Sequence, residues 1–242
     1  MTRSTRGPVG RLAAEYLRPA NTLVALFPGK VVGFETRAPV PEALLHPEEA
    51  SFVSSAVEKR RQEFAGGRIC ARRALEELDI FDFPLVVGKN RFPIWPEGTR
   101  GSITHTRGYC ASLVANSRHY DGIGIDVEQR GRLDRRLEGR ICTEEEQSWL
   151  ASLPASERID MATVLFSAKE AFYKSQYCVT RKGLGFHDAV VRVEGDCFEV
   201  KLRKPVEYFR RRKEVLRGRF AIGEAHVFAA IGLRVGSEIR SG

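Results

Sequence analysis

The sequence has few cysteines, and none of them are arranged as a pair. Five cysteines are scattered singly through 242 residues, and no C-x-x-C motif occurs. An odd, dispersed set excludes the disulfide framework of a small secreted domain. It is typical of free or buried thiols in a reducing compartment.

Long apolar runs are also missing. The only apolar run near the N-terminus covers residues 23–27, which is too short for a signal sequence or a membrane span. No long linker, low-complexity tract or obvious repeat interrupts the chain. We therefore expect a cytoplasmic protein with no membrane span.

Acidic residues are fewer than basic ones. Lysine and arginine number 39 against 31 aspartates and glutamates, which gives a net charge of +8. This excess of positive charge indicates an anionic partner. The partner could be a nucleotide, a nucleic acid, a membrane surface or an acidic protein, and net charge alone does not distinguish them. The apolar content of 43% is ordinary for a globular protein, and the length allows one large domain or two small ones.

The pattern of apolar residues predicts a mixed α and β protein. Helical spacing predicts helices over residues 48–79, 144–150 and 154–177, the second of them opened by a capping box at Thr143. Because helices do not alternate regularly with strands, we expect an α+β fold with antiparallel hairpins rather than a doubly wound sheet. The predicted strands are residues 31–35, 83–87, 109–115, 122–128, 189–193, 198–202, 219–222 and 227–233.

The predicted helix over 48–79 combines two glycines with a basic side. Gly66 and Gly67 interrupt its pattern, so we expect a kink or close packing there. Arg61 and Arg68 are seven residues apart, about two turns, and share a face. A solvated basic face is the simplest interpretation of this side.

The strand predicted over residues 122–128 carries two acidic side chains. Ile123, Ile125 and Val127 alternate with polar or small residues, so the apolar set points to one face and Asp126 and Glu128 to the other. Two adjacent carboxylates on such a strand repel each other unless a cation lies between them. The pattern therefore indicates a cation site.

The helix predicted over residues 154–177 offers a third carboxylate, Glu170, between Lys169 and Lys174. On its own, the Glu170–Lys174 spacing is typical of a solvated i,i+4 pair worth about 0.3–0.5 kcal/mol. Together with the two acidic residues of the strand, it favours an oxygen-liganded divalent ion, Mg²⁺, that holds a phosphate-bearing substrate.

A lone histidine, His105, follows the small residues Gly101, Ser102 and Thr104. Backbone N–H groups and an imidazole in such a stretch can bind an anion. A locally hydrogen-bonded histidine is the alternative interpretation.

Three ordered motifs resemble the successive signatures of the 4′-phosphopantetheinyl transferases. They are G-S-I-T-H at residues 101–105, G-I-D-V-E at 124–128 and F-S-A-K-E-A-F-Y-K at 166–174. Two further stretches, R-F-P-I-W-P at 91–96 and the K-R-R-x-E-F-x-x-x-R helix at 59–68, look like the branch that contains the enterobactin synthetase D component, as does R-G-R-F at 217–220. Together the matches span about residues 55–235.

The resemblance implies a fold of two similar α+β halves related by a pseudo-two-fold, which divides this chain into residues 1–120 and 121–242. It also implies a monomer that moves the phosphopantetheine arm of coenzyme A onto a serine of an apo acyl, peptidyl or polyketide carrier protein. The resemblance further implies that Mg²⁺ assists this transfer and that adenosine 3′,5′-bisphosphate is released. Carrier domains of this kind are usually acidic, so binding to them would explain the positive net charge of this chain.

The resemblance also assigns roles to residues. Asp126, Glu128 and Glu170 are expected to hold Mg²⁺, with Glu170 the first choice for the base that accepts the serine proton and Glu128 the second. Lys169 and Lys174 would complement the charge on the leaving phosphate.

Other residues match positions that bind coenzyme A in relatives. Arg60, Arg68 and His105 match positions that hold its 3′-phosphate. Either Lys89 or Arg91 lies at the nucleotide loop, whose spacing varies among relatives. Ser102 and Thr104 either contact phosphate or shape the turn.

Two other functions are compatible with the residues. A metal-dependent nuclease also uses acidic residues and basic charge, but Lys169 and Glu170 fall on a helix and no basic-aromatic interleaving marks a strand-binding groove. A non-catalytic module that binds carrier proteins is the other alternative. The presence of all three metal-ligand candidates argues against it. We therefore expect carrier proteins and coenzyme A as partners, and no nucleic acid.

Overall fold

The computed structural model describes residues 15–133, 135–212 and 215–236. It contains two antiparallel sheets, which confirms the α+β class. The first sheet has the order β1 (Arg18–Pro19), β2 (Val32–Thr36), β4 (Tyr109–Asn116), β3 (Thr99–Thr106). The second has the order β5 (Tyr120–Gln129), β9 (His226–Arg234), β8 (Leu216–Ile222), β7 (Cys197–Leu202), β6 (Ala189–Glu194).

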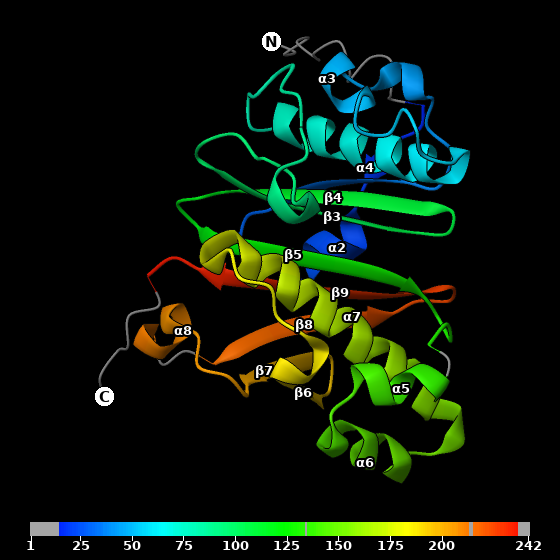
Figure 1. The fold of residues 1–242 in the computed structure, drawn as a ribbon, viewed down its shortest axis with the longest axis vertical. Coiled ribbons are helices and arrows are strands. Elements are labelled where there is room, and N and C mark those ends of the chain that lie inside the picture. Colours follow the sequence, from blue (N-terminus) through cyan, green and yellow to red (C-terminus); the bar gives the residue numbers. More distant parts are fainter. Residues whose placement is uncertain (1–14, 134, 213–214, 237–242) are drawn as a thin grey trace.

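One long helix lies on each sheet (Figure 1). Helix α4 (Glu58–Glu76) packs on β2, β3 and β4, and helix α7 (Ala155–Thr180) packs on β5 and β9. This arrangement agrees with two α+β halves. The boundary at residue 120 and the pseudo-two-fold relation stay predictions. The shorter helices are α2 (Asn21–Ala25), η1 (Glu42–Leu44), α3 (Pro47–Ala50), η2 (Lys89–Arg91), α5 (Arg135–Ile141), α6 (Glu144–Ser152), η3 (Phe186–Asp188) and α8 (Glu207–Arg212).

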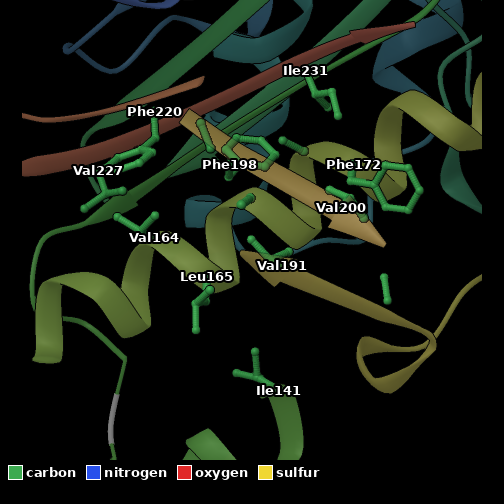
Figure 2. Close-up of a cluster of buried hydrophobic side chains, with 14 of the residues drawn as sticks. Ile141, Val164, Leu165, Phe172, Val191, Phe198, Val200, Phe220, Val227 and Ile231 are labelled. Atoms are coloured by element: carbon green, nitrogen blue, oxygen red, sulfur yellow. The ribbon is translucent and has the colours of Figure 1, made fainter. Parts of the chain in front are cut away.

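The core of the second half lies between α7 and its sheet. Figure 2 shows Val164, Leu165 and Phe172 of α7 beside Phe198 and other apolar side chains of the sheet. Those three helix residues and Phe198 are fully buried. Burying such a side chain stabilises the fold by about 1.5–3 kcal/mol, so this contact fixes where α7 lies.

The other face of β5 forms part of a second core at the seam between the halves. Ile123, Ile125 and Val127 are fully buried there, packed with Leu23 and Leu113 of the N-terminal half. The alternation of the sequence therefore predicted this face correctly, because a two-residue period sends every second side chain to the same side.

The prediction of one helix over residues 48–79 is wrong. The chain forms α3, then turns, and α4 starts after Val57, whose backbone is extended (φ −62°, ψ 151°). Gly66 and Gly67 do not kink α4. They allow close packing instead, since a Cβ at Gly66 would lie 2.8 Å from Cys110 Sγ and one at Gly67 2.7 Å from Ile103.

The strand predicted over residues 83–87 is also wrong. Only Val87 forms a bridge, to Pro93, at the base of the η2 loop. Pro84 has no N–H to donate to a ladder, which disfavours a strand at this point. The remaining predicted strands and the capping box at Thr143, whose hydroxyl accepts the amide N–H of Glu146, are confirmed.

Within the described ranges, no helix has both the length and the apolar character needed to span a bilayer.

Candidate active site

Two glycines of β5 allow helix α7 to lie directly on the strand. A Cβ at Gly122 would overlap the carbonyl oxygen of Ser175, and a Cβ at Gly124 would overlap that of Ala171. Because side chains alternate along a strand, these glycines are on the same face of β5 as Asp126. The α7 side chains beside these contacts, Glu170 and Lys174, are therefore held near Asp126.

Lys174 of α7 makes the direct contact with that carboxylate. Its Nζ lies 2.8 Å from Asp126 Oδ1 and 3.0 Å from the carbonyl oxygen of Ile125. The predicted i,i+4 partner of Lys174, Glu170, is on the same helix and is electrostatically coupled to both Lys174 and Asp126. The structure thus brings the strand and helix motifs into one charged cluster.

The two glutamates of this cluster are poorly solvated. Burial raises the pKa of Glu128 to about 7, and the Asp126 charge adds to the shift, while Arg132 and Lys174 oppose it. Burial likewise raises the pKa of Glu170, with Lys174 lowering it and Asp126 raising it. Both carboxylates would gain stability as anions from a nearby cation.

Asp126 has one carboxylate oxygen that makes no hydrogen bond within the described part of the chain. Asp126 is 5% exposed, and its Oδ2 is buried with no hydrogen bond to any residue that the structure describes. Buried carboxylate oxygens normally have a partner, so this atom has the character of a ligand for a hard cation. The donor set of Asp126, Glu128 and Glu170 fits Mg²⁺ or a similar ion.

The acidic side chains are also engaged by basic ones. Arg132 Nη1 lies 2.8 Å from Glu128 Oε2, and Lys174 holds Asp126. Among the residues that the structure describes, no group of three or more histidine, cysteine or acidic side chains is arranged to hold a metal ion. The Mg²⁺ site therefore stays a prediction that rests on the chemistry of the three carboxylates.

Arg60 and Arg68 of α4 and Arg91 of η2 line one cavity of about 390 Å³. The cavity also has an apolar wall that includes Phe52 and Phe64. Three guanidinium groups beside an apolar surface suit a phosphate attached to an organic group.

Arg68 is the buried member of the three, which corrects the interpretation of a solvated basic face. It is 6% exposed, its Nε donates to the carbonyl oxygen of Leu85 at 3.0 Å, and its guanidinium lies 4.0 Å from the Phe64 ring centre. Burial lowers the pKa of Arg68 to about 10, opposed by Glu49. The group therefore stays charged at neutral pH.

His105 contacts Arg60 of this arginine cavity and interacts electrostatically with Asp126 and Lys174. Its Nε2 lies 2.8 Å from Arg60 Nη1, and its Nδ1 lies 3.6 Å from Glu63. Burial lowers the pKa of His105, with Arg60 also lowering it and Glu63 opposing. The neutral imidazole accepts from the arginine through Nε2 in this arrangement.

Lys89 and Arg91, the two candidates for the nucleotide contact, both lie in η2 but line different cavities. Arg91 faces the arginine cavity, whereas Lys89 lines a larger cavity of about 750 Å³ at the seam. Phe92, Tyr177 and Arg181 line this second cavity, and the two rings are 4.9 Å apart. Of the two candidates, Arg91 is therefore the one that shares a cavity with the other arginines.

The loop that carries Arg91 touches α7 directly. Asn90 Nδ2 donates to the hydroxyl of Tyr177 at 3.0 Å. The backbones of Asn90 and Arg91 are in the left-handed region (φ 56° and 62°), which is uncommon for residues with side chains. Tyr177 was not among the predicted site residues, although it lies seven residues after Glu170 and thus about two turns along the same helix face.

The prediction that Lys169 contacts the cofactor is wrong. Its ammonium is fully buried and donates to Glu146 Oε2 at 2.7 Å and to the carbonyl oxygens of Ile141 and Phe186. Glu146 is itself buried and also accepts the amide N–H of Val191. With three acceptors, Lys169 has no donor left for a phosphate.

Ser102 and Thr104 also do not present their hydroxyls to a ligand. Both are buried, and their oxygens accept amide N–H groups of β5, from Ile125 at 3.1 Å and from Val127 at 3.0 Å. The prediction that they bind the cofactor is therefore corrected: they join the two halves. Sequence alone gives no sign of this, because the partners are more than twenty residues away.

Comparison with known proteins gives consistent results along the chain. Residues 48–115 match the family described as the 4′-phosphopantetheinyl transferase N-terminal domain, and residues 122–225 match the 4′-phosphopantetheinyl transferase superfamily. The 4′-phosphopantetheinyl transferase Svp of Streptomyces mobaraensis is 39% identical over 196 residues, which cover 79% of each chain.

Two further similarities are more limited. Enterobactin synthase component D of Salmonella typhi is 34% identical over 125 residues, half of each chain. A crystal structure of a holo-(acyl-carrier-protein) synthase from Bacillus anthracis in complex with CoA (3′,5′-ADP) matches with a TM-score of 0.37 and 24% identity, over 48% of this chain and 97% of that one.

Proposed function

Because this chain belongs to the 4′-phosphopantetheinyl transferase family and is an enzyme of that class, we propose that it moves the 4′-phosphopantetheine arm of coenzyme A to a serine of an apo carrier protein with the help of Mg²⁺. The observation that carries the proposal is the buried Oδ2 of Asp126, which has no partner among the described residues, in a cluster with two carboxylates whose pKa values burial raises. A bound cation would stabilise the charged form of these carboxylates, and phosphoryl transfer uses one.

Asp126, Glu128 and Glu170 would hold the ion. When bound, Mg²⁺ neutralises charge on the pyrophosphate and orients it. Lys174 adds a positive charge beside Asp126, 2.8 Å from its carboxylate, so negative charge that builds on the leaving phosphate meets an ammonium from the protein itself.

The chemical step forms one bond and breaks one. The serine oxygen attacks the phosphorus that bears the pantetheine arm, and the bond from that phosphorus to the bridging oxygen of the pyrophosphate breaks. Adenosine 3′,5′-bisphosphate leaves with the bond electrons. Glu170, whose pKa is raised by burial, accepts the serine proton directly or through water, and Glu128 is the alternative base.

The arginine cavity gives coenzyme A its second point of attachment. We assign the 3′-phosphate to Arg60, Arg68 and Arg91, with His105 between this group and the carboxylates. Phe92, Tyr177 and Arg181 border the neighbouring cavity and suit a stacked purine, where Lys89 would face the nucleotide as well. The two attachment points orient the pyrophosphate across the seam.

The test is a mass measurement on a panel of apo carrier proteins after incubation with the enzyme, coenzyme A and Mg²⁺. We expect each accepted carrier to gain one phosphopantetheine, and the gain to disappear with Glu170→Gln but to persist with Glu145→Gln, an exposed acid on α6. Nucleic-acid cleavage without such a gain would favour the nuclease alternative. Binding of carriers without a gain would favour the non-catalytic module. Light scattering checks the predicted monomer.

A further inference from the structure

The two halves meet along β3 and β5, which are the edge strands of their sheets and lie side by side. Hydroxyl groups supply hydrogen bonds across this seam. Ser102 Oγ accepts from the amide of Ile125, and Thr104 Oγ1 accepts from the amide of Val127. These two buried hydroxyls therefore satisfy main-chain donors on both sides of Asp126.

Thr104 makes one contact that Ser102 does not make. Its Oγ1 also lies 3.3 Å from Asp126 Oδ1 and donates to it, since a hydroxyl is both a donor and an acceptor. Lys174 Nζ donates to the same Oδ1 at 2.8 Å. Oδ1 is thus held by two protein donors, while Oδ2 has none among the described residues.

We infer that Thr104 is a positioning residue that fixes the Asp126 carboxylate so that Oδ2, not Oδ1, is the oxygen left for the metal ion. This inference rests on the proposed function. Two bonds on Oδ1 stop the carboxylate from rotating about its own axis. Groups that orient a metal ligand in this way usually change metal affinity about 10- to 100-fold when removed.

The experiment compares three single variants of the full chain. Thr104→Val keeps the shape but removes the hydroxyl, Thr104→Ser keeps the hydroxyl, and Ser102→Ala removes the neighbouring seam hydroxyl that does not touch Asp126. Mn²⁺ alone serves as the probe, and its binding is measured by electron paramagnetic resonance. Thermal unfolding is measured on the same samples.

We expect Thr104→Val to bind Mn²⁺ about 10- to 100-fold more weakly. Thr104→Ser and Ser102→Ala should bind it within about threefold of the wild type, although Ser102→Ala loses thermal stability like Thr104→Val. In transfer assays, extra Mg²⁺ should restore part of the rate to Thr104→Val.

Three results would overturn the inference: unchanged Mn²⁺ affinity in Thr104→Val, an equal loss in Ser102→Ala, or no rescue by Thr104→Ser. The first two would show that the hydroxyls hold the seam and nothing more. If the wild type binds Mn²⁺ and the variants behave as expected but no carrier gains mass, the positioning role stands and the proposed transfer fails. The two claims are therefore tested separately.

Discussion

Replacing Gly124 with alanine tests how α7 reaches the carboxylates. The new Cβ would overlap the carbonyl oxygen of Ala171 and would lie 2.8 Å from the amide nitrogen of Ser175. Main-chain atoms of a helix cannot move aside alone, so the whole helix must shift away from β5. We expect lower stability and lower activity together.

The expected loss of stability in Gly124→Ala depends on which atoms the new Cβ meets. Overpacking a core costs about 1–3 kcal/mol, and a main-chain obstacle puts Gly124→Ala at the upper end, about 3 kcal/mol. For a chain of this length 1 kcal/mol moves Tm by about 2–4 °C, so a fall of roughly 6–12 °C is expected. A shift of about 1 Å at Glu170 and Lys174 should reduce the transfer rate about 100-fold.

Calorimetry and a carrier-loading assay measure the two effects. Gly183→Ala is the matched control, because Gly183 is exposed and a Cβ there meets no atom within 4 Å. Its Tm and rate should stay close to those of the wild type. If Gly124→Ala has a wild-type Tm and a wild-type rate, the close contact of α7 with β5 does not position the site.

Three other perturbations have defined outcomes. Lys169→Met leaves Glu146 buried without its partner and should cost about 3–5 kcal/mol in urea unfolding, whereas the exposed Lys182→Met should cost little; equal losses would refute the buried pair. Arg91→Gln should raise KM for coenzyme A but not for 3′-dephospho-coenzyme A. An equal rise of KM for both compounds would refute the assignment of Arg91 to the 3′-phosphate. Protonation of His105 is disfavoured in the folded state because burial lowers its pKa. Arg60 and Lys174 also lower this pKa, whereas Glu63 and Asp126 raise it. Stability should therefore fall as pH drops below about 6.5, and less so in His105→Gln; identical pH profiles of Tm would contradict this.

The acidic strand and the long C-terminal helix were predictable because each carries its own periodicity. The alternation around Asp126 predicted the buried face of β5, and the helical spacing before Glu170 predicted the helix that covers it. Gly122 and Gly124 of β5 have no side chain, so a pattern of apolar and polar side chains does not reveal their role. Their role becomes visible only when the helix backbone lies on them.

The roles of single polar residues were harder to predict. Lys169 and Glu170 are neighbours in sequence but meet different surroundings, because successive residues on a helix point about 100° apart. Thr104 has the same hydroxyl whether it binds phosphate or an amide of another strand. Long-range partners such as Glu146 for Lys169 and Val127 for Thr104 decide these roles, and no local pattern contains them.

The proposed function requires Asp126, Glu128 and Glu170 to share one metal ion. A crystal soaked with Mn²⁺ and coenzyme A tests it through the anomalous scattering of the metal. We expect one anomalous peak about 2.0–2.3 Å from Asp126 Oδ2 and from an oxygen of each glutamate. A peak bound elsewhere, or three carboxylates that remain apart with coenzyme A in place, would contradict it.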